Sequence, residues 1–320
     1  MLETTAGTAV AATAIWRGKG LIEDQREVRF PEEDVGYLSL VDRSYTPAYA
    51  AVLAMDEIEA TFEQLPYILT AGVKAVTSGS ADGTGSGYVY TYTFPTTTAN
   101  TVSTFTIEAG DNQEVEEMEY AFVESFKLSG AMGEAVMMSA EWRGRQATLS
   151  SFTGALSVPT VEEILASKTK LYIDAISGTI GTTQKTGTLL SWALNVTTGM
   201  QAYTTADGAL YFTANKQVGP EVTLELVFEF DGTSTAEKVI WRAGTARLIR
   251  LEVQGTALTT AGTFSYKTLR IDLAGKWEKF NKIDEQDGND FIAATFRSRY
   301  DSTSASFAEI KVVNNLSALP

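Results

Sequence analysis

The chain has 320 residues, of which 44% are hydrophobic and 20% are charged, as in globular and unlike disordered proteins. It contains no Cys and no His, which excludes disulfides, thiol nucleophiles, Cys/His zinc sites and triads with a His base. The formal net charge is −15, and most of the excess lies in residues 1–160. Because non-specific DNA affinity comes from Lys and Arg, this charge argues against a conventional nucleic-acid binder.

The first part of the chain predicts an arm followed by strands. No apolar run approaches the ~20 residues of a membrane span, and the small-residue stretch 7–15 lacks the basic region of a signal peptide. We therefore expect synthesis in the cytoplasm. Residues 1–36 carry little regular pattern and predict an arm or long loop. Strands are predicted at 37–41 and within 48–60.

A helix is predicted to open at Thr61. Thr61 and Gln64 form a capping box, and an apolar face follows at helical spacing. The Gly-rich segment 78–87 lacks the Lys of a phosphate-binding loop and is interpreted as a linker. Alternation over 88–94 predicts the next strand.

Residues 114–146 predict a long β-hairpin with a turn at the Gly130 and Gly133 pair. Period-two alternation predicts one dry and one wet face. The expected dry face contains Met118, Tyr120, Phe122, Phe126, Leu128, Val136, Met138, Ala140 and Trp142. The expected wet face contains Glu117, Glu119, Ser125, Lys127, Ser139, Glu141 and Arg143. From the residues alone, a plain solvent face is the simpler interpretation of this second row.

The second half predicts the same order of elements. Residues 151–169 are turn-rich, and Thr160 with Glu163 predicts a short helix there. Strands are predicted at 190–197, 210–214 and 222–230, and Ser234 with Glu237 predicts a capped helix ending at Gly244. Further strands are expected at 248–253, 268–273, 291–300 and 307–313, with a loop at 275–290. Strand, capped helix, strand and hairpin thus occur at 48–146 and again at 221–300, which we interpret as a duplicated domain.

This order of elements resembles the tail tube (major tail) proteins of long-tailed, siphovirus-type bacteriophages. The residues that carry the resemblance cover most of the chain and contain no catalytic signature. They are FPEEDVGYLSLVDRSYTP (30–47) leading into EATFEQLPYIL (59–69), MEYAFVESFKLSG (118–130) with EWRG (141–144), SWALNVTTGMQAYTTADGALYFT (191–213) and LRIDLAGKWEKFNKIDEQDGNDFIAATFRSRYD (269–301).

The resemblance implies a mainly β fold of two tandem tail-tube-type β-sandwich or partial-barrel domains. Each domain has a flanking α-helix and a long hairpin that joins a ring-wide inner β-barrel. We expect an arm at 1–36, a first domain at 37–150, a linker with a short helix at 151–169, and a second domain at 170–320. The resemblance further implies a homotrimeric ring with pseudo-six-fold symmetry, stacked into the tube of a virion tail.

The same resemblance implies roles for individual residues and partners. Residues expected to line the lumen are Glu117, Glu119, Ser125, Lys127, Ser139, Glu141, Arg143, Thr268, Arg270 and Asp272. DNA is expected to pass this polar, acidic lumen without specific binding. Tape measure, tail tip and terminator proteins are the other expected partners. Neither enzymatic activity nor a cofactor is expected.

Other interpretations of the sequence remain open. Asp284, Asp287 and Asp290 lack the spacing of a calcium loop, so we expect a solvated loop or a ring-to-ring contact. A secreted β-sandwich adhesin or fibre-type binding module is the alternative function, disfavoured by the missing signal peptide and the acidic hairpin face. A glycosidase with paired carboxylates would need an aromatic-lined cleft, and no sequence feature selects one.

Overall fold

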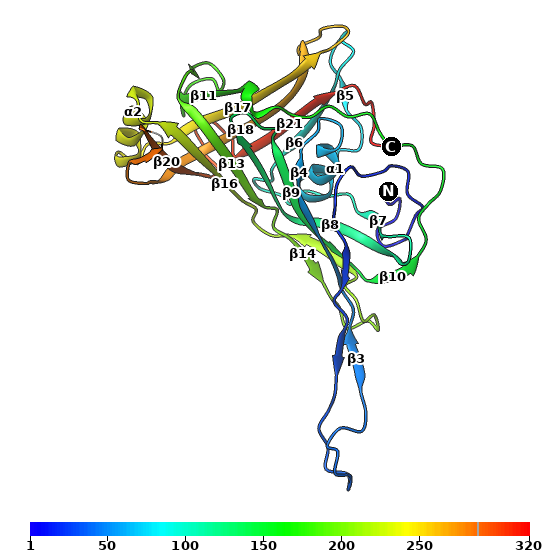
Figure 1. The fold of residues 1–320 in the computed structure, drawn as a ribbon. Helices are drawn as coiled ribbons and strands as arrows, with labels where there is room; N and C mark the ends of the chain where they lie inside the picture. Colours follow the sequence, from blue (N-terminus) through cyan, green and yellow to red (C-terminus); the bar gives the residue numbers. More distant parts are fainter. Residues whose placement is uncertain (287) are drawn as a thin grey trace.

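Two layers of antiparallel strands pack face to face in the computed structural model, which describes residues 1–286 and 288–320 (Figure 1). The first layer, here called the long sheet, contains in pairing order β4 (Ala51–Glu59), β9 (Met137–Gly144), β8 (Val115–Ala131), β13 (Leu189–Thr197), β16 (Glu221–Glu229) and β20 (Asn289–Ser298). The second layer, the covering sheet, contains β11 (Thr169–Ala175), β17 (Arg247–Ala257), β18 (Tyr266–Phe280), β21 (Ala308–Asn314) and β6 (Tyr88–Thr93). The last part of β18 also pairs with β20, so this strand joins the two layers.

One large core fills the space between the layers. Every second residue of the long sheet, such as Leu53, Leu128 and Leu224, points into it. Residues of the covering sheet, such as Ile249 and Ile271, meet them there. The expected mainly β fold is therefore confirmed, and its strands form a large antiparallel sheet.

The described residues contain two α-helices. Helix α1 (Leu65–Gly72) lies inside the fold against β8. Helix α2 (Gly232–Arg242) lies at the left-hand edge of the molecule in Figure 1. Pro66 fits α1 because it sits in the first turn, where a backbone N–H needs no helical partner. At α2 the capping box consists of Asp231 and Ser234, one turn earlier than Ser234 and Glu237 would place it.

The short helix predicted within 151–169 is wrong as an α-helix. This region contains only η1, a single 3-10 turn at Ala166–Lys168. Glu163 does not cap it, because its backbone forms an isolated β-bridge with Thr61. Pairing with another segment has therefore overridden the local capping pattern.

The hairpin β8–β9 is confirmed, but its single dry face is wrong. Tyr120 has a positive φ of 56°, and the register shifts at Glu124 between Val123 and Ser125, so side chains change sides twice along β8. Met118 and Phe126 therefore face the large core. Tyr120 and Phe122 face the opposite side, in a second cluster with Val102, Met200 and Phe212.

Met200 of this second cluster belongs to β14 (Met200–Tyr203), which forms a small ribbon with β15 (Ala214–Gln217), and Phe212 lies between these two strands. The strand predicted at 210–214 is wrong in its bounds, since β15 begins only at Ala214. The first part of β8 belongs to a separate small sheet, where it pairs with β7 (Phe105–Gly110) and β10 (Ala147–Ser150). A strand buried on both faces explains why its row of apolar residues continues through the kinks.

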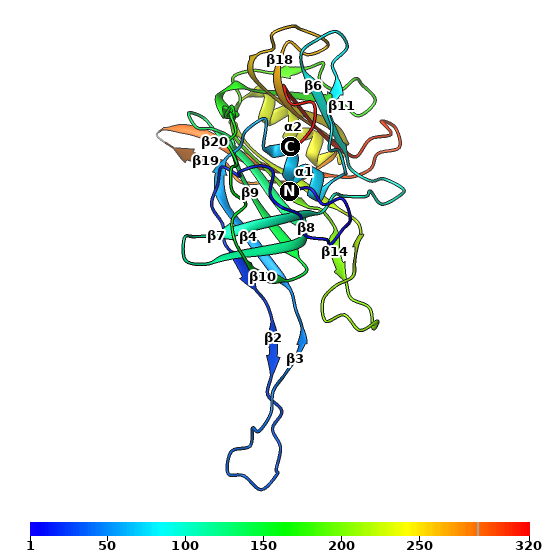
Figure 2. The same ribbon diagram turned by 90° about the vertical axis from the view of Figure 1, so that its right-hand side faces the viewer.

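A second and longer ribbon projects far from the body (Figure 2). Strand β1 (Ile22–Asp24) pairs with β4, and the chain then runs outward through β2 (Glu27–Arg29) and returns through β3 (Tyr45–Ala48). The segment 25–50 is here called the arm. The strand predicted at 37–41 is wrong, because those residues form the exposed end of the arm. The boundary predicted at residue 36 therefore falls inside the arm.

The order of elements and their pairings recur along the chain. The pairs β1–β4, β4–β9, β7–β8, β8–β9 and β8–β10 reappear, in the same order, as β13–β16, β16–β20, β17–β18, β18–β20 and β18–β21. Short strands β5 (Ser80–Ala81), β12 (Gln184–Lys185) and β19 (Asp284–Gln286) flank this pattern. The repetition anticipated from 48–146 and 221–300 thus extends to the pairing of strands.

Truncation of either buried aromatic of the hairpin is expected to destabilise the fold by about 3–5 kcal/mol, because Phe122 and Trp142 are both almost fully buried. Chemical unfolding of Phe122→Ala and Trp142→Ala measures this, with Ser139→Ala as a control expected to stay within about 0.5 kcal/mol. Phe122→Ala alone should also increase hydrogen exchange in the β14–β15 ribbon. Equal exchange in both variants would contradict the two separate clusters.

Candidate functional site

The surface of the long sheet that faces away from the core is the candidate site, here called the polar face. Its residues alternate with core residues along every strand, and cross-strand partners such as Lys127 and Asn195 share this side. The polar face contains Ala54, Glu57, Glu124, Ser125, Lys127, Ser139, Glu141, Arg143, Asn195, Thr197, Glu221, Thr223, Glu225, Thr295 and Arg297. A hollow of about 340 Å³ over β4, β9, β8 and β13 shows that this face is concave at its middle.

The basic side chains of the polar face form ion pairs with neighbouring carboxylates. The Lys127 Nζ lies 3.4 Å from the Glu57 Oε1, and the Arg143 Nε lies 3.7 Å from the Glu124 Oε1. Within the described residues, Glu141 and Glu225 form no ion pair, and Glu141 accepts a hydrogen bond from the Ser125 Oγ at 3.1 Å. The face therefore carries surplus negative charge.

A bulge with a Glu–Arg pair occurs once in each half of the chain. In β8 the bulged Glu124 lies beside Arg143, and in β18 the bulged Glu278 lies 3.8 Å from Arg297. Arg297 also pairs with Glu221 at 2.8 Å. Sequence reasoning missed Asn195, Glu225 and Arg297, although the alternation in 190–197 and 222–230 marks two of these as outward-facing.

Only part of the predicted lumen set lies on the polar face. Ser125, Lys127, Ser139, Glu141 and Arg143 come together there, on neighbouring strands. Glu117 and Glu119 lie beyond the kink at Tyr120, where β8 pairs with β7 and β10 instead.

The environment of Glu117 and Glu119 differs from that of the polar face. Burial raises the pKa of each, opposed at Glu119 by Arg145, whose Nη1 lies 3.9 Å from the Glu119 Oε1. The Gln146 Nε2 also donates to Glu119 at 3.2 Å. Arg145 stacks on the ring of Tyr120 in turn. These contacts tie Glu119 into the small sheet.

Thr268, Arg270 and Asp272 lie on the covering sheet, in the part of β18 that pairs with β17 and β21. Arg270 pairs with Glu252 at 2.6 Å, Asp272 pairs with Arg250 at 2.6 Å, and Thr268 is buried. The sheet register therefore places all three residues on another layer, apart from Ser125 and Lys127, and engages Arg270 and Asp272 in ion pairs there.

The predicted inter-ring loop is a short hairpin formed by β19 and β20. Asp284 pairs with Phe291, and Glu285 pairs with Asp290. Both Asp284 and Asp290 are exposed. Asp287 lies outside the described residues.

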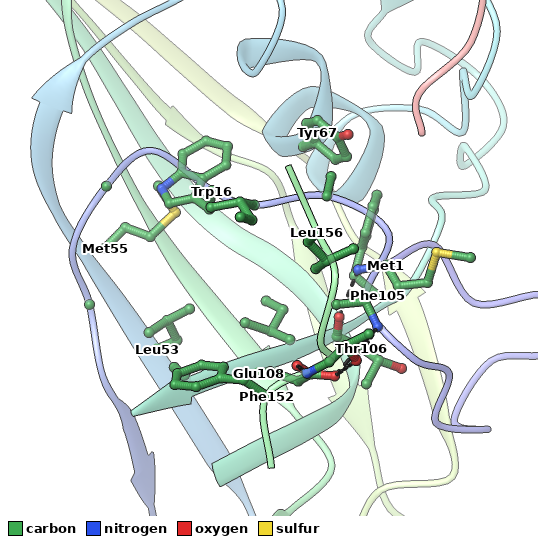
Figure 3. A pocket seen from close by; sticks show the side chains of 18 of the residues that line it. Met1, Trp16, Leu53, Met55, Tyr67, Phe105, Thr106, Glu108, Phe152 and Leu156 are labelled. Atoms are coloured by element: carbon green, nitrogen blue, oxygen red, sulfur yellow. Dashed lines mark hydrogen bonds between the residues drawn. The ribbon is translucent and has the colours of Figure 1, made fainter. Parts of the chain in front are cut away.

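A larger cavity of about 540 Å³ lies between β4, β7 and the N-terminal segment (Figure 3). Its walls are mostly apolar and include Trp16, Phe105 and Trp142. The carboxylate of Glu108 at its edge accepts hydrogen bonds from the Thr153 N at 2.7 Å and the Thr153 Oγ1 at 2.6 Å. Its acidic group therefore serves to hold the loop at Thr153.

A metal site, a membrane-spanning helix and known relatives were each sought. Among the described residues, no cluster of three or more acidic side chains has the geometry of a metal site. Within the same residues, no helix is long and apolar enough to cross a membrane. No protein-family model matches the chain, and a search of curated proteins found no match either.

The half-buried carboxylate of Glu124 predicts a pH-dependent stability. Burial raises its pKa above the ordinary value of 4.5, and Arg143 only partly opposes this. A raised pKa in the folded state means that ionisation costs stability, so the penalty is absent below the ordinary pKa and complete above the raised one. Glu124→Gln should therefore be more stable than the wild type near pH 7, and the difference should vanish near pH 4.

Urea unfolding at both pH values measures this effect, with the exposed Glu225→Gln as the matched control. Lower stability of Glu124→Gln at pH 7 would contradict the prediction, because the pair with Arg143 would then outweigh burial.

Proposed function

We propose that this protein is the structural subunit of a tail tube of the long-tailed bacteriophage type. Three copies close into a ring, rings stack into a tube, and the polar face forms the inner wall through which DNA passes. The observation that carries the proposal is the long sheet: strands from both halves of the chain share one continuous polar face with surplus negative charge.

The recurrence of strand pairings supports two tandem tail-tube-type units in one chain. The first extends from β1 to β10, and so begins before the expected boundary at residue 37, and the second extends to β21. Each unit then contributes one α-helix and one long hairpin, β8–β9 or β18–β20. Three chains with two units each give a ring of pseudo-six-fold symmetry. A head-to-tail contact whose rotation closes produces such a ring and leaves no free sheet edge.

The charge of the polar face suits a conduit. Glu141 and Glu225 present the same sign of charge as DNA phosphates, so the wall repels the duplex and holds no particular sequence. The ion pairs of Lys127 and Arg143 keep those cations from neutralising phosphates. On this proposal the protein is a virion component without enzymatic activity or cofactor. Its partners are further copies of itself and the tape measure, tail tip and terminator proteins.

The arm suits contact between stacked rings. It projects beyond the body, and its end exposes Phe30, Tyr37, Leu38 and Leu40, with Leu38 fully accessible. A cluster of exposed apolar side chains on one projection is typical of a docking segment. We assign ring stacking to the arm in preference to the β19–β20 hairpin, which exposes mainly acidic residues.

The proposal is tested by reversing charge on the polar face. In Glu141→Lys/Glu225→Lys, the side chains at both sites are exposed, so folding and tube formation should survive. The change makes the net charge of each chain more positive by about four units, because two carboxylates are lost and two ammonium groups are gained, and bound phosphates would release counterions and hold the duplex. DNA ejection from phage that carry the variant should slow, more at low salt than at high salt.

The matched control is Glu134→Lys/Glu163→Lys, an equal charge change at exposed loop positions away from the polar face. Negative-stain microscopy of both purified proteins checks tube formation. Unchanged ejection by the polar-face variant at every salt concentration, with normal tubes, would show that this face does not line the conduit.

The arm yields a separate prediction. Tyr37, Leu38 and Leu40 are exposed and do not belong to a core cluster of the single chain, so replacing them with Ser should leave the melting temperature unchanged. Rings should still form but should fail to stack into tubes. Sedimentation and microscopy distinguish the two states, and tubes of normal length in this variant would refute the assignment.

A further inference from the structure

One strand pairing of the long sheet has no counterpart within the chain. Pairings around β8 recur around β18, as described above, but β8 also pairs with β13 on its free side over seven residue pairs, from Ser191↔Ala131 to Thr197↔Ser125. By the repeat, β8 corresponds to β18 and β13 corresponds to β1. No ladder joins β1 to β18 in the part of the chain that the structure describes.

Both strands of the missing pair present an edge. The N-terminal segment runs along β4, with β1 paired to Leu53 and its neighbours and the Asp56 N donating to the Lys19 O at 3.2 Å. Its other side carries no ladder among the described residues. In β18, residues 276–280 pair with β20 on one side only, and the Glu278 O accepts a side-chain bond from the Trp241 Nε1 at 3.2 Å.

We propose that β1 of one copy, with Gln25, pairs antiparallel with residues 279–282 of the next copy, in the register of the β13–β8 junction. The inference deepens the proposed function and rests on it for ring closure, while the strand pairing itself rests on the repeat. The occupant of each edge is a second copy of this chain.

The register follows from aligned residues. Leu53 pairs with Ile22 and Trp142, as Leu224 pairs with Leu194 and Phe296. Ile22 therefore corresponds to Leu194, and Gln25 corresponds to Thr197.

On the other strand, the bulged Glu124 corresponds to Glu278, so Ser125 corresponds to Lys279. Because Thr197 pairs with Ser125, Gln25 of one copy lies opposite Lys279 of the next. Glu23 then lies opposite Asn281.

Charge supports this partner. The β1 edge carries the acidic Glu23 and Asp24, and the edge of the next copy carries Lys279 and Lys282, all four exposed. In the proposed register Glu23 is a diagonal neighbour of Lys279, close enough for the two side chains to interact. Like charges at either edge would instead oppose the contact.

The absence of cysteine makes a direct test possible. Gln25→Cys/Lys279→Cys, oxidised under assembly conditions, should convert most of the monomer band into covalent oligomers that dithiothreitol reverses. Thr197→Cys/Ser125→Cys calibrates the geometry, because it should form the equivalent disulfide within one chain. Gln25→Cys/Lys276→Cys is three residues out of register, about 10 Å along the strand, and should remain monomeric.

The possible outcomes distinguish a failure of the strand pairing from a failure of the proposed function. Tubes that form without the Gln25–Lys279 cross-link, while the internal control oxidises, overturn the strand pairing and leave the proposed function standing. Cross-linked oligomers that never produce hollow tubes support the pairing and overturn the function. A protein that stays monomeric in every variant overturns both.

Discussion

Backbone pairing between β8 and β13 is the interaction on which the rest of the structure depends. An unpaired sheet edge presents rows of N–H and C=O groups that must find partners. Here seven residue pairs join β8, from the hairpin of the first half, to β13 of the second half. This junction turns two groups of strands into one sheet, and it gives that sheet one shared core side and one shared polar side.

The close fit at this junction depends on a small residue. A side-chain carbon added at Gly130 would lie only 2.7 Å from the Trp192 Nε1, so any larger residue would push the indole away. Trp192 in turn donates to the Thr169 Oγ1 at 3.2 Å, which ties the junction to the covering sheet. Packing on the core side thus fixes the position of this part of the long sheet, and the polar side chains on the other side point away from the core.

The sequence predicts correctly those elements in which the alternation of apolar and polar side chains continues without interruption. The hairpin, β13, β16 and both helices follow from period two or from an apolar helical face. It failed at β8, where Tyr120 and Phe122 continue the apolar row although the strand has turned over, because a second cluster buries them on the other side. Glu124, which interrupts that row, was the one signal of the bulge.

The candidate site was recovered only where strands continue without kinks. Ser125, Lys127, Ser139 and Glu141 share the predicted face, whereas Glu117 lies beyond a turn in the backbone that residue types do not encode. Arg270 and Asp272 follow the predicted alternation of polar and apolar residues, but they belong to the covering sheet. Alternation indicates which face of a strand a side chain is on, and it does not indicate which sheet contains the strand. The arm has no period, because solvent surrounds it on all sides.

The central claim is that one chain contains two fused units, so that three chains complete a ring. Mass measurement of the smallest closed assembly tests it most directly. The account predicts a particle about three times the 34.6 kDa chain mass, with three-fold symmetry in projection. A ring of six chains, or a monomer that never closes in the presence of its initiating tail proteins, would contradict it.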